Sequence, residues 1–140
     1  MELAEAMGWI GARSHGVLTT IRANGRPQLS NVSYAAAADG KIRISITADR
    51  AKYVNLVRDP RAALHVSRED FYGYVVIDGD AALAPVTVAA SDATSDELVD
   101  LYRTLAGEHP DWDEYRTAMI GERRTVLTIT PTHAYGMLGG

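Results

Sequence analysis

Two cations and an amide stand at the start of a predicted helix, in a pattern that suits a bound anion. Arg50, Lys52 and Asn55 follow a strand-like segment and open a segment with helical periodicity. The first turn of a helix presents free N–H groups and a partial positive charge, which favour phosphate and disfavour unbalanced cations. Lys52 and Asn55 are three residues apart, so they share one helix face. The pattern fits a phosphate site, and it fits equally well a structure in which both cations pair with Asp49, Asp59 or the acidic helix.

Polar residues on two predicted strands can line the same groove. The segment 28–31, with Gln28, Ser30 and Asn31, is polar where a barrel wall normally alternates with apolar residues. Its hydroxyl and amide groups can hydrogen-bond a heterocycle edge or a sugar-like chain. Ser45 and Thr47 face away from the apolar side of the following strand and lead directly to Arg50. A solvated strand face explains residues 28–31 equally well.

Other candidate chemistry is weaker. The four histidines (His15, His65, His109 and His133) show no ligand spacing, so we expect no metal site. Neither a Gly-rich phosphate loop nor a nucleophile elbow is present, and no side chain is assigned a catalytic role. The aromatic run at 71–74 can stack on a flat ring, or it can serve as barrel core or dimer contact.

Composition limits the function further. The chain has 140 residues, a net charge of −4 and no cysteine, which argues against general nucleic-acid binding, disulfides and thiol catalysis. It shows neither a secretory signal nor an apolar run long enough for a membrane span, so we expect a cytoplasmic protein. Residues 41–61 hold six basic and two acidic residues, whereas residues 91–114 hold eight acidic residues and one basic residue. Positive charge in one short segment of an acidic chain is compatible with a small bound anion, but on charge alone two solvated helix faces of opposite sign explain the pattern better.

The elements that must position these residues follow from hydrophobic periodicity and turn signals. Helices are predicted at 3–12, 50–58, 95–106 and 112–120, with Asp49 and either Thr94 or Ser95 as caps. Strands are predicted at 17–21, 27–37, 41–47, 62–67, 72–83 and 124–137, with Pro131 at a bulge or edge. Tight turns at Asn24-Gly25 and Asp39-Gly40 join the first three. This order predicts one mainly β domain over residues 1–140, a six-stranded antiparallel barrel.

These segments together resemble the flavin-binding split β-barrel superfamily of pyridoxamine 5'-phosphate oxidase-like proteins. More narrowly, the chain is similar to the actinobacterial deazaflavin-dependent reductases that use coenzyme F420. The matching stretches cover nearly the whole chain in order: 16–21 (GVLTTI), 25–32 (GRPQLSNV), 50–52 (RAK), 55–56 (NL), 58–61 (RDPR), 101–103 (LYR), 107–109 (GEH), 111–112 (DW) and 135–137 (YGM).

The resemblance implies a homodimer with the cofactor in a groove between subunits. It implies that Arg50 and Lys52 hold the phosphate or acidic tail, and that the ring and side chain are lined by Gln28, Ser30, Asn31, Ser45 and Ile46. The partner's residues 72–74 (Tyr72, Gly73 and Tyr74) would close the site, where relatives often carry Trp in place of Tyr72. A reduced deazaflavin would then pass hydride to an electron-poor organic acceptor. An FMN-dependent oxidase or reductase, and a non-catalytic F420 carrier, remain open alternatives.

Overall fold

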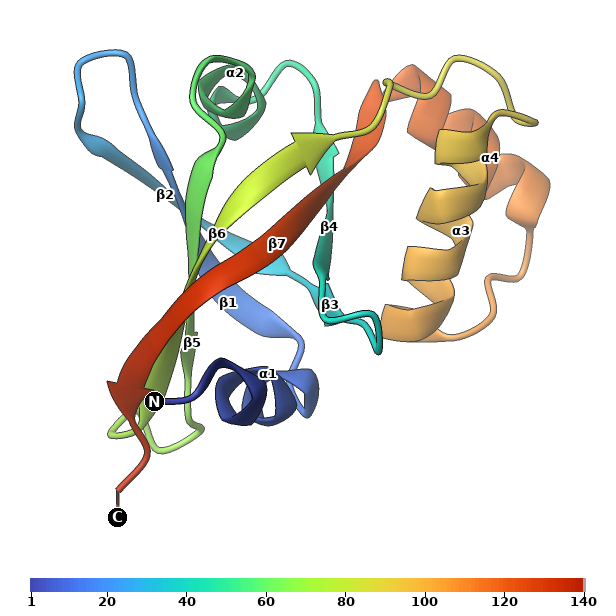
Figure 1. Cartoon of the computed structure of the whole chain (residues 1–140). Helices are drawn as coiled ribbons and strands as arrows, with labels where there is room; N and C mark the ends of the chain where they lie inside the picture. The colour runs from blue at the N-terminus through green and yellow to red at the C-terminus, as the bar shows by residue number, and fades with distance from the viewer. Residues whose placement is uncertain (140) are drawn as a thin grey trace.

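The computed structural model describes residues 1–139, which form one curled antiparallel sheet with four helices (Figure 1). The sheet order is β2-β1-β5-β6-β7-β4-β3. The strands are β1 (His15–Ile21), β2 (Pro27–Ser33), β3 (Ala35–Ala36), β4 (Ile42–Thr47), β5 (Arg61–Ser67), β6 (Tyr74–Leu83) and β7 (Arg124–Met137). The helices are α1 (Leu3–Gly11), α2 (Ala51–Arg58), α3 (Ala93–Ala106) and α4 (Trp112–Gly121).

The sheet curls into a barrel because both of its edges come from one run of chain. β2 pairs with β1, and β3 pairs with β4. Yet only Tyr34 separates β2 from β3 in the sequence. The buried Tyr34 donates its hydroxyl to the Ile10 carbonyl at 2.6 Å and its N–H to the Ser14 carbonyl at 2.8 Å. The chain therefore leaves one ladder at Tyr34 and joins the other. This break divides the predicted strand 27–37, so the sheet has seven strands where six were predicted.

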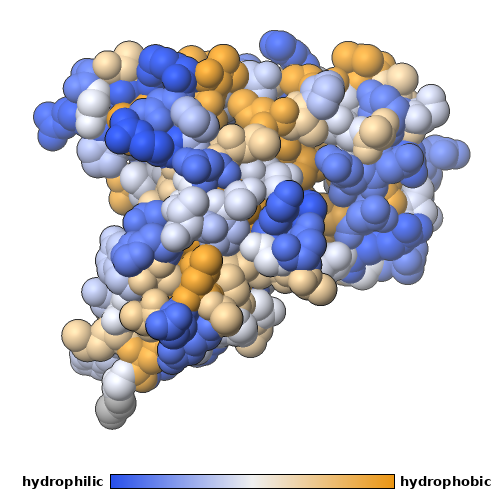
Figure 2. Space-filling model, viewed as in Figure 1, coloured by the Kyte–Doolittle hydropathy of each residue, from blue (hydrophilic) through white to orange (hydrophobic). Residues whose placement is uncertain are grey.

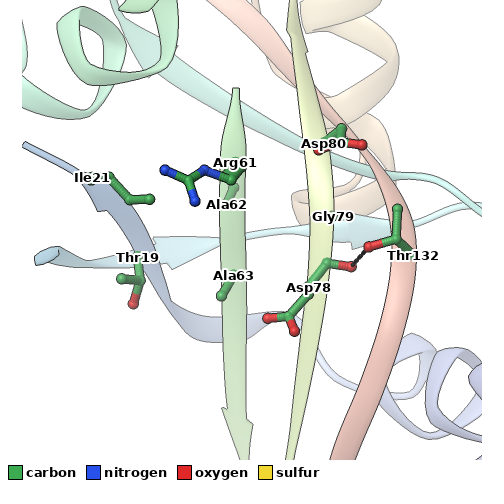
Figure 3. Close-up of a pocket in the computed structure, with 9 residues that line it drawn as sticks. All are labelled: Thr19, Ile21, Arg61, Ala62, Ala63, Asp78, Gly79, Asp80 and Thr132. Carbon is green, nitrogen blue, oxygen red and sulfur yellow. Dashed lines mark hydrogen bonds between the residues drawn. The ribbon is translucent and has the colours of Figure 1, made fainter. Parts of the chain in front are cut away.

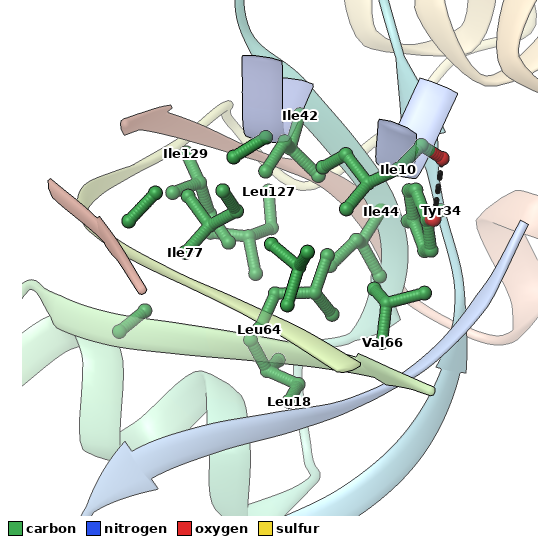
Figure 4. Packing of buried hydrophobic residues seen from close by; sticks show 14 of the residues in the cluster. Ile10, Leu18, Tyr34, Ile42, Ile44, Leu64, Val66, Ile77, Leu127 and Ile129 are labelled. Carbon is green, nitrogen blue, oxygen red and sulfur yellow. Dashed lines mark hydrogen bonds between the residues drawn. The ribbon is translucent and has the colours of Figure 1, made fainter. Parts of the chain in front are cut away.

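The barrel interior is filled by the inward side chains of its strands, as strand alternation requires (Figure 4). The predicted alternation of β4 is confirmed: Ile42, Ile44 and Ile46 are buried, whereas the residues between them are partly exposed. α1 and α2 lie at opposite ends of the barrel, and α3 and α4 lie side by side, with α3 next to β3, β4 and β7 and α4 next to β7 (Figure 1). The outer face of β1, β5 and β6 carries no helix among the described residues.

Two helix starts differ from the sequence prediction. α2 has Arg50 at its N-cap position, and no side chain caps it, so the expected cap by Asp49 is absent. α3 is capped by Asp92, whose carboxylate accepts the N–H of Ser95 at 2.8 Å. The predicted cap at Thr94 or Ser95 was therefore placed too late, because Ser95 supplies the capped N–H and Asp92 the acceptor.

The β5–β6 and β6–β7 ladders also depart from simple periodicity. β6 begins at Tyr74 and not at residue 72, because Phe71 has φ 73° and the segment before Tyr74 forms a tight turn. The β6–β7 register shifts between Asp78 and Gly79, next to Pro131, so of the two predicted alternatives, a bulge or an edge position, the structure has the bulge.

Candidate functional site

A groove opens where the barrel splits between β2 and β4. Its volume is about 340 Å³, and the starts of α2 and β7 and the end of α3 complete its walls. The lining residues are Asn31, Val32, Ser33, Ser45, Ile46, Thr47, Arg50, Lys52, Leu105 and Arg124. Six of them belong to the set chosen from the sequence: Asn31, Ser45, Ile46, Thr47, Arg50 and Lys52. We call this site the β2–β4 groove.

The two cations at the start of α2 have no protein partner. Among the described residues, the side chains of Arg50 and Lys52 form neither an ion pair nor a hydrogen bond. Asp59, one of the carboxylates that could have paired with them, is bound to Arg61 at 2.8 Å. The alternative reading, in which the protein's own carboxylates neutralise both cations, therefore does not describe this structure.

Positive charge accumulates in the β2–β4 groove. The pKa of Lys52 lies below its ordinary value because the side chain is partly buried and because Arg50 and Arg124 lie nearby. The first turn of α2 adds N–H groups that no side chain caps. A bound anion would relieve the repulsion between these cations and would accept hydrogen bonds from the helix start.

Four lining residues were not predicted from the sequence: Val32, Ser33, Leu105 and Arg124. Arg124 is the charged one among them. Its guanidinium binds the Glu122 carboxylate at 3.0 Å and donates to the Ser45 hydroxyl at 3.3 Å. It reaches the groove because Arg124 is paired with Thr47 in the β4–β7 ladder. A pairing between strands nearly 80 residues apart leaves no local signal, although the arginine at the start of the last predicted strand was visible.

Three predicted residues on other parts of the wall lie outside the groove lining. Asn55 is buried; its amide donates to the Thr20 hydroxyl at 3.1 Å, and its carbonyl oxygen accepts from Arg58 at 3.2 Å. This side chain therefore fastens α2 to β1. Gln28 and Ser30 lie on β2, and the Ser30 hydroxyl is buried without a hydrogen-bond partner. Ser30 points to the same side of β2 as Val32, which packs against the barrel core, and Ser30 does not line the groove.

The aromatic segment 72–74 lies apart from the groove of its own protomer. Tyr72 is 81% exposed in the β5–β6 turn. Gly73 packs against Arg68, where an added Cβ would approach the guanidinium carbon to 3.0 Å. Tyr74 stacks on His65 with a ring separation of 5.3 Å. A role for this segment at the site therefore requires a second protomer.

A further cavity of about 380 Å³ lies on the outer face of the sheet (Figure 3). It contains the Asp78 and Asp80 carboxylates and the Arg61 guanidinium, which is already paired with Asp59. Two free carboxylates would repel a phosphate, so the β2–β4 groove is the better candidate for an anion site. Its free cations and its uncapped helix start fit the phosphate of a flavin-type cofactor.

Known structures share this architecture. A conserved hypothetical protein from Mycobacterium tuberculosis is 24% identical with a TM-score of 0.73, covering 98% of this chain and 84% of its own. The structure of an F420 reductase is 23% identical with a TM-score of 0.67; the match covers 87% of this chain and 89% of that protein. A heme-binding protein from Mycobacterium smegmatis is 19% identical with a TM-score of 0.69; the match covers 99% of this chain and 55% of that protein. At these identities the likenesses establish the fold, and the same fold carries different ligands.

No helix within residues 1–139 is long and apolar enough to cross a membrane.

The family follows from the sequence itself. The sequence model of the pyridoxamine 5'-phosphate oxidase family matches residues 4–138, which is nearly the whole chain. The chain therefore belongs to the pyridoxamine 5'-phosphate oxidase family of flavin-binding split barrels.

Proposed function

We propose that the protein is an oxidoreductase that uses coenzyme F420 and reduces a small electron-poor organic acceptor. The observation that supports this most strongly is the pair of unpartnered cations, Arg50 and Lys52, in the β2–β4 groove. A group with a phosphate and a flat ring fits a groove that is cationic at the helix start and polar along β2 and β4. The resemblance of the motifs to F420-dependent reductases and the structural likeness to an F420 reductase favour the deazaflavin.

Each wall of the groove has its own role in this proposal. Arg50, Lys52 and the first turn of α2 bind the phosphate, and Arg124 lies close enough to bind a second negative group. Ser45 and Asn31 hydrogen-bond the ring or its side chain. A reduced deazaflavin supplies a hydride to the acceptor when it is bound. The protein's part is to hold the ring and exclude water.

The proposal includes a homodimer formed through the outer face of the sheet. Large apolar side chains are exposed on this face and on the adjoining β5–β6 turn: Leu29 58%, Phe71 80%, Tyr72 81%, Tyr135 48% and Met137 59%. Exposed apolar patches of this kind mark interaction surfaces. In the dimer, the partner's segment 72–74 would close the groove, which its own protomer leaves open. Sedimentation velocity tests this: Tyr135→Asp with Met137→Asp should yield a monomer.

Calorimetric titration of the purified protein with F420 and with FMN tests the cofactor. We expect F420 to bind at least ten times more tightly than FMN. Tighter binding of FMN would favour the alternative of an FMN-dependent oxidase or reductase. Tight binding of F420 without accelerated oxidation of the reduced cofactor, over a broad panel of acceptors, would favour a carrier protein.

A further inference from the structure

A second cavity adjoins the β2–β4 groove across β2. It has a volume of about 530 Å³ and lies over β1, β2 and β5 on the outer face of the sheet. Asn31, Val32 and Ser33 line both spaces. The two spaces are therefore neighbours, and a ligand seated in the groove with its ring along β2 lies at the edge of the second cavity. We call this second space the imidazole cavity.

The imidazole cavity has a different chemistry from the groove. Two histidines, His15 and His65, line it together with the hydroxyl side chains of Ser33 and Ser67 and the apolar side chain of Val17. None of its described lining residues is a lysine, arginine, aspartate or glutamate. Its volume is within the range of about 300–1,000 Å³ that is usual for small-molecule sites. Such a cavity suits a neutral molecule with an oxygen that accepts hydrogen bonds.

His65 is the better positioned of the two imidazoles. It lies on β5 in the middle of the sheet, opposite Val17 on one side and Val76 on the other. The Tyr74 ring stacks on it at 5.3 Å with an angle of 13° between the planes, which fixes the orientation of the imidazole. His15, at the start of β1, is exposed. His65 is therefore held in place, whereas His15 lies where the cavity meets solvent.

We propose that the imidazole cavity binds the acceptor, a neutral conjugated carbonyl compound, and that His65 donates the proton that the reduction consumes. This inference rests on the proposed function. The acceptor carbon would gain the hydride and the carbonyl oxygen would take a proton from the His65 imidazole. The cofactor, which loses a hydride and a proton on oxidation, would release that proton to water, and water would return a proton to His65. The acceptor is thus reduced by two electrons and the cofactor is oxidised by two. An imidazole can give and regain a proton near neutral pH, as this role requires.

The proposed dimer strengthens this assignment. The imidazole cavity lies on the sheet face that we propose to pack against the partner, so the second subunit would cover it and exclude water. Removal of water strengthens the hydrogen bond from an imidazole to a carbonyl oxygen. The cavity would then be a closed chamber beside the ring, with the groove holding the charged part of the cofactor outside it.

Proton NMR of the histidine rings tests the binding site. The F420-loaded protein is titrated with two neutral carbonyl probes, 2-cyclohexen-1-one and menadione, in separate experiments. At least one probe should shift the His65 ring signal saturably, while the signals of His109 and His133 stay in place. An unmoved His65 signal with both probes would overturn the inference.

The variant His65→Gln tests the proton donor, with His133→Gln as the matched control on the same sheet face. His65→Gln should leave the F420 dissociation constant within about two-fold and slow the oxidation of reduced F420 by the bound probe about 100-fold. The control should change neither. Equal rates in His65→Gln and the parent, or a loss of F420 binding in that variant, would reject the catalytic role. Failure of the parent itself to bind F420 would reject the proposed function as well, and the cofactor titration alone reveals it.

Discussion

Two charged regions of the molecule differ in how their charges are neutralised. In α3 and α4, Arg103 pairs with Glu108 at 2.9 Å and Arg116 pairs with Asp96 at 2.8 Å. In the β2–β4 groove, Arg50 and Lys52 have no such partner among the described residues. Paired surface charges contribute little and need no ligand. Unpaired cations that converge on a groove are destabilising until an anion arrives, so the groove, and not the helical pair, indicates a ligand.

The same contrast exists within the basic segment 41–61. Arg43 binds Asp39 at 2.7 Å, Arg61 binds Asp59, and the Arg58 guanidinium donates to the Asn55 carbonyl oxygen. Three of the six basic residues in this segment therefore bind groups of the protein itself. Net charge over a segment cannot separate the two kinds of cation; only the identity of their partners can.

The largest expected effect comes from removing both free cations. Arg50→Gln with Lys52→Gln should weaken F420 binding about 100-fold or more, since each charge-assisted hydrogen bond is worth about 1.5–3 kcal/mol. The melting temperature should stay within about 2 °C of the parent, because neither side chain has a protein partner to lose. Calorimetry and thermal unfolding measure both quantities.

The matched control is Arg103→Gln with Arg116→Gln, which removes two arginines from the region of paired charges. It should lower the melting temperature only slightly, chiefly through the lost hydrogen bonds of Arg116 to the Ala90 carbonyl and the Ser95 hydroxyl, and leave F420 affinity within about two-fold. If this variant lost as much affinity as the groove variant, net charge and not the groove would hold the ligand, and the distinction between the two regions would fail.

Asp92 tests how strongly the helical region depends on internal partners. Burial alone would raise the pKa of Asp92, but the N–H groups of Val88, Ser95 and Ala89 and the hydroxyl of Thr87 hold it at about 2. Asp92→Ala should cost about 2 kcal/mol and lower the melting temperature by roughly 5–8 °C, with no effect on binding. Asp111→Ala is the milder control, because the Asp111 carboxylate caps only the N–H of Glu114.

The difference in melting temperature between the parent and Asp92→Ala should become smaller as the pH falls. The folded-state pKa of Asp92 is below its ordinary value of 3.8, so its stabilisation is complete above that value and disappears as the pH falls towards 2. The gap in melting temperature between the parent and Asp92→Ala should therefore be constant above about pH 5 and close in acid. A gap that persisted undiminished at pH 2 would show that the carboxylate charge is not what stabilises the helix start.

Arg124 has a property of each region: it lines the β2–β4 groove, and its guanidinium is paired with a carboxylate. Arg124→Gln should weaken F420 binding by about five-fold, less than removal of a free cation, since part of its charge already serves Glu122. Glu122→Gln should release that guanidinium and strengthen binding by about two-fold. Weaker binding in Glu122→Gln would mean that Glu122 positions Arg124 for the ligand and does not compete with it.

The sequence predicted what repeats locally and missed what depends on distant pairing. The alternation at 42–47 and the Pro131 bulge were predicted because strand alternation and the missing proline N–H are local properties. The break at Tyr34 was missed, because its cause is a hydrogen bond to Ile10 that only the folded chain creates. For the same reason Arg124 was not seen as a groove residue, and Asn55 was expected at the site although it faces Thr20.

The smallest expected effect is a pH dependence of cofactor binding. Burial, Arg50 and Arg124 lower the pKa of Lys52 in the free protein, and a bound anion raises it again. Binding is therefore strongest while Lys52 is protonated, and the affinity for F420 should fall by a few-fold as the pH rises through the lowered pKa. Lys52→Arg should bind with nearly constant affinity over the same alkaline range, because arginine stays charged there. Parallel decreases for the parent and Lys52→Arg, measured by calorimetry at matched ionic strength, would assign the pH dependence to the cofactor and not to the groove.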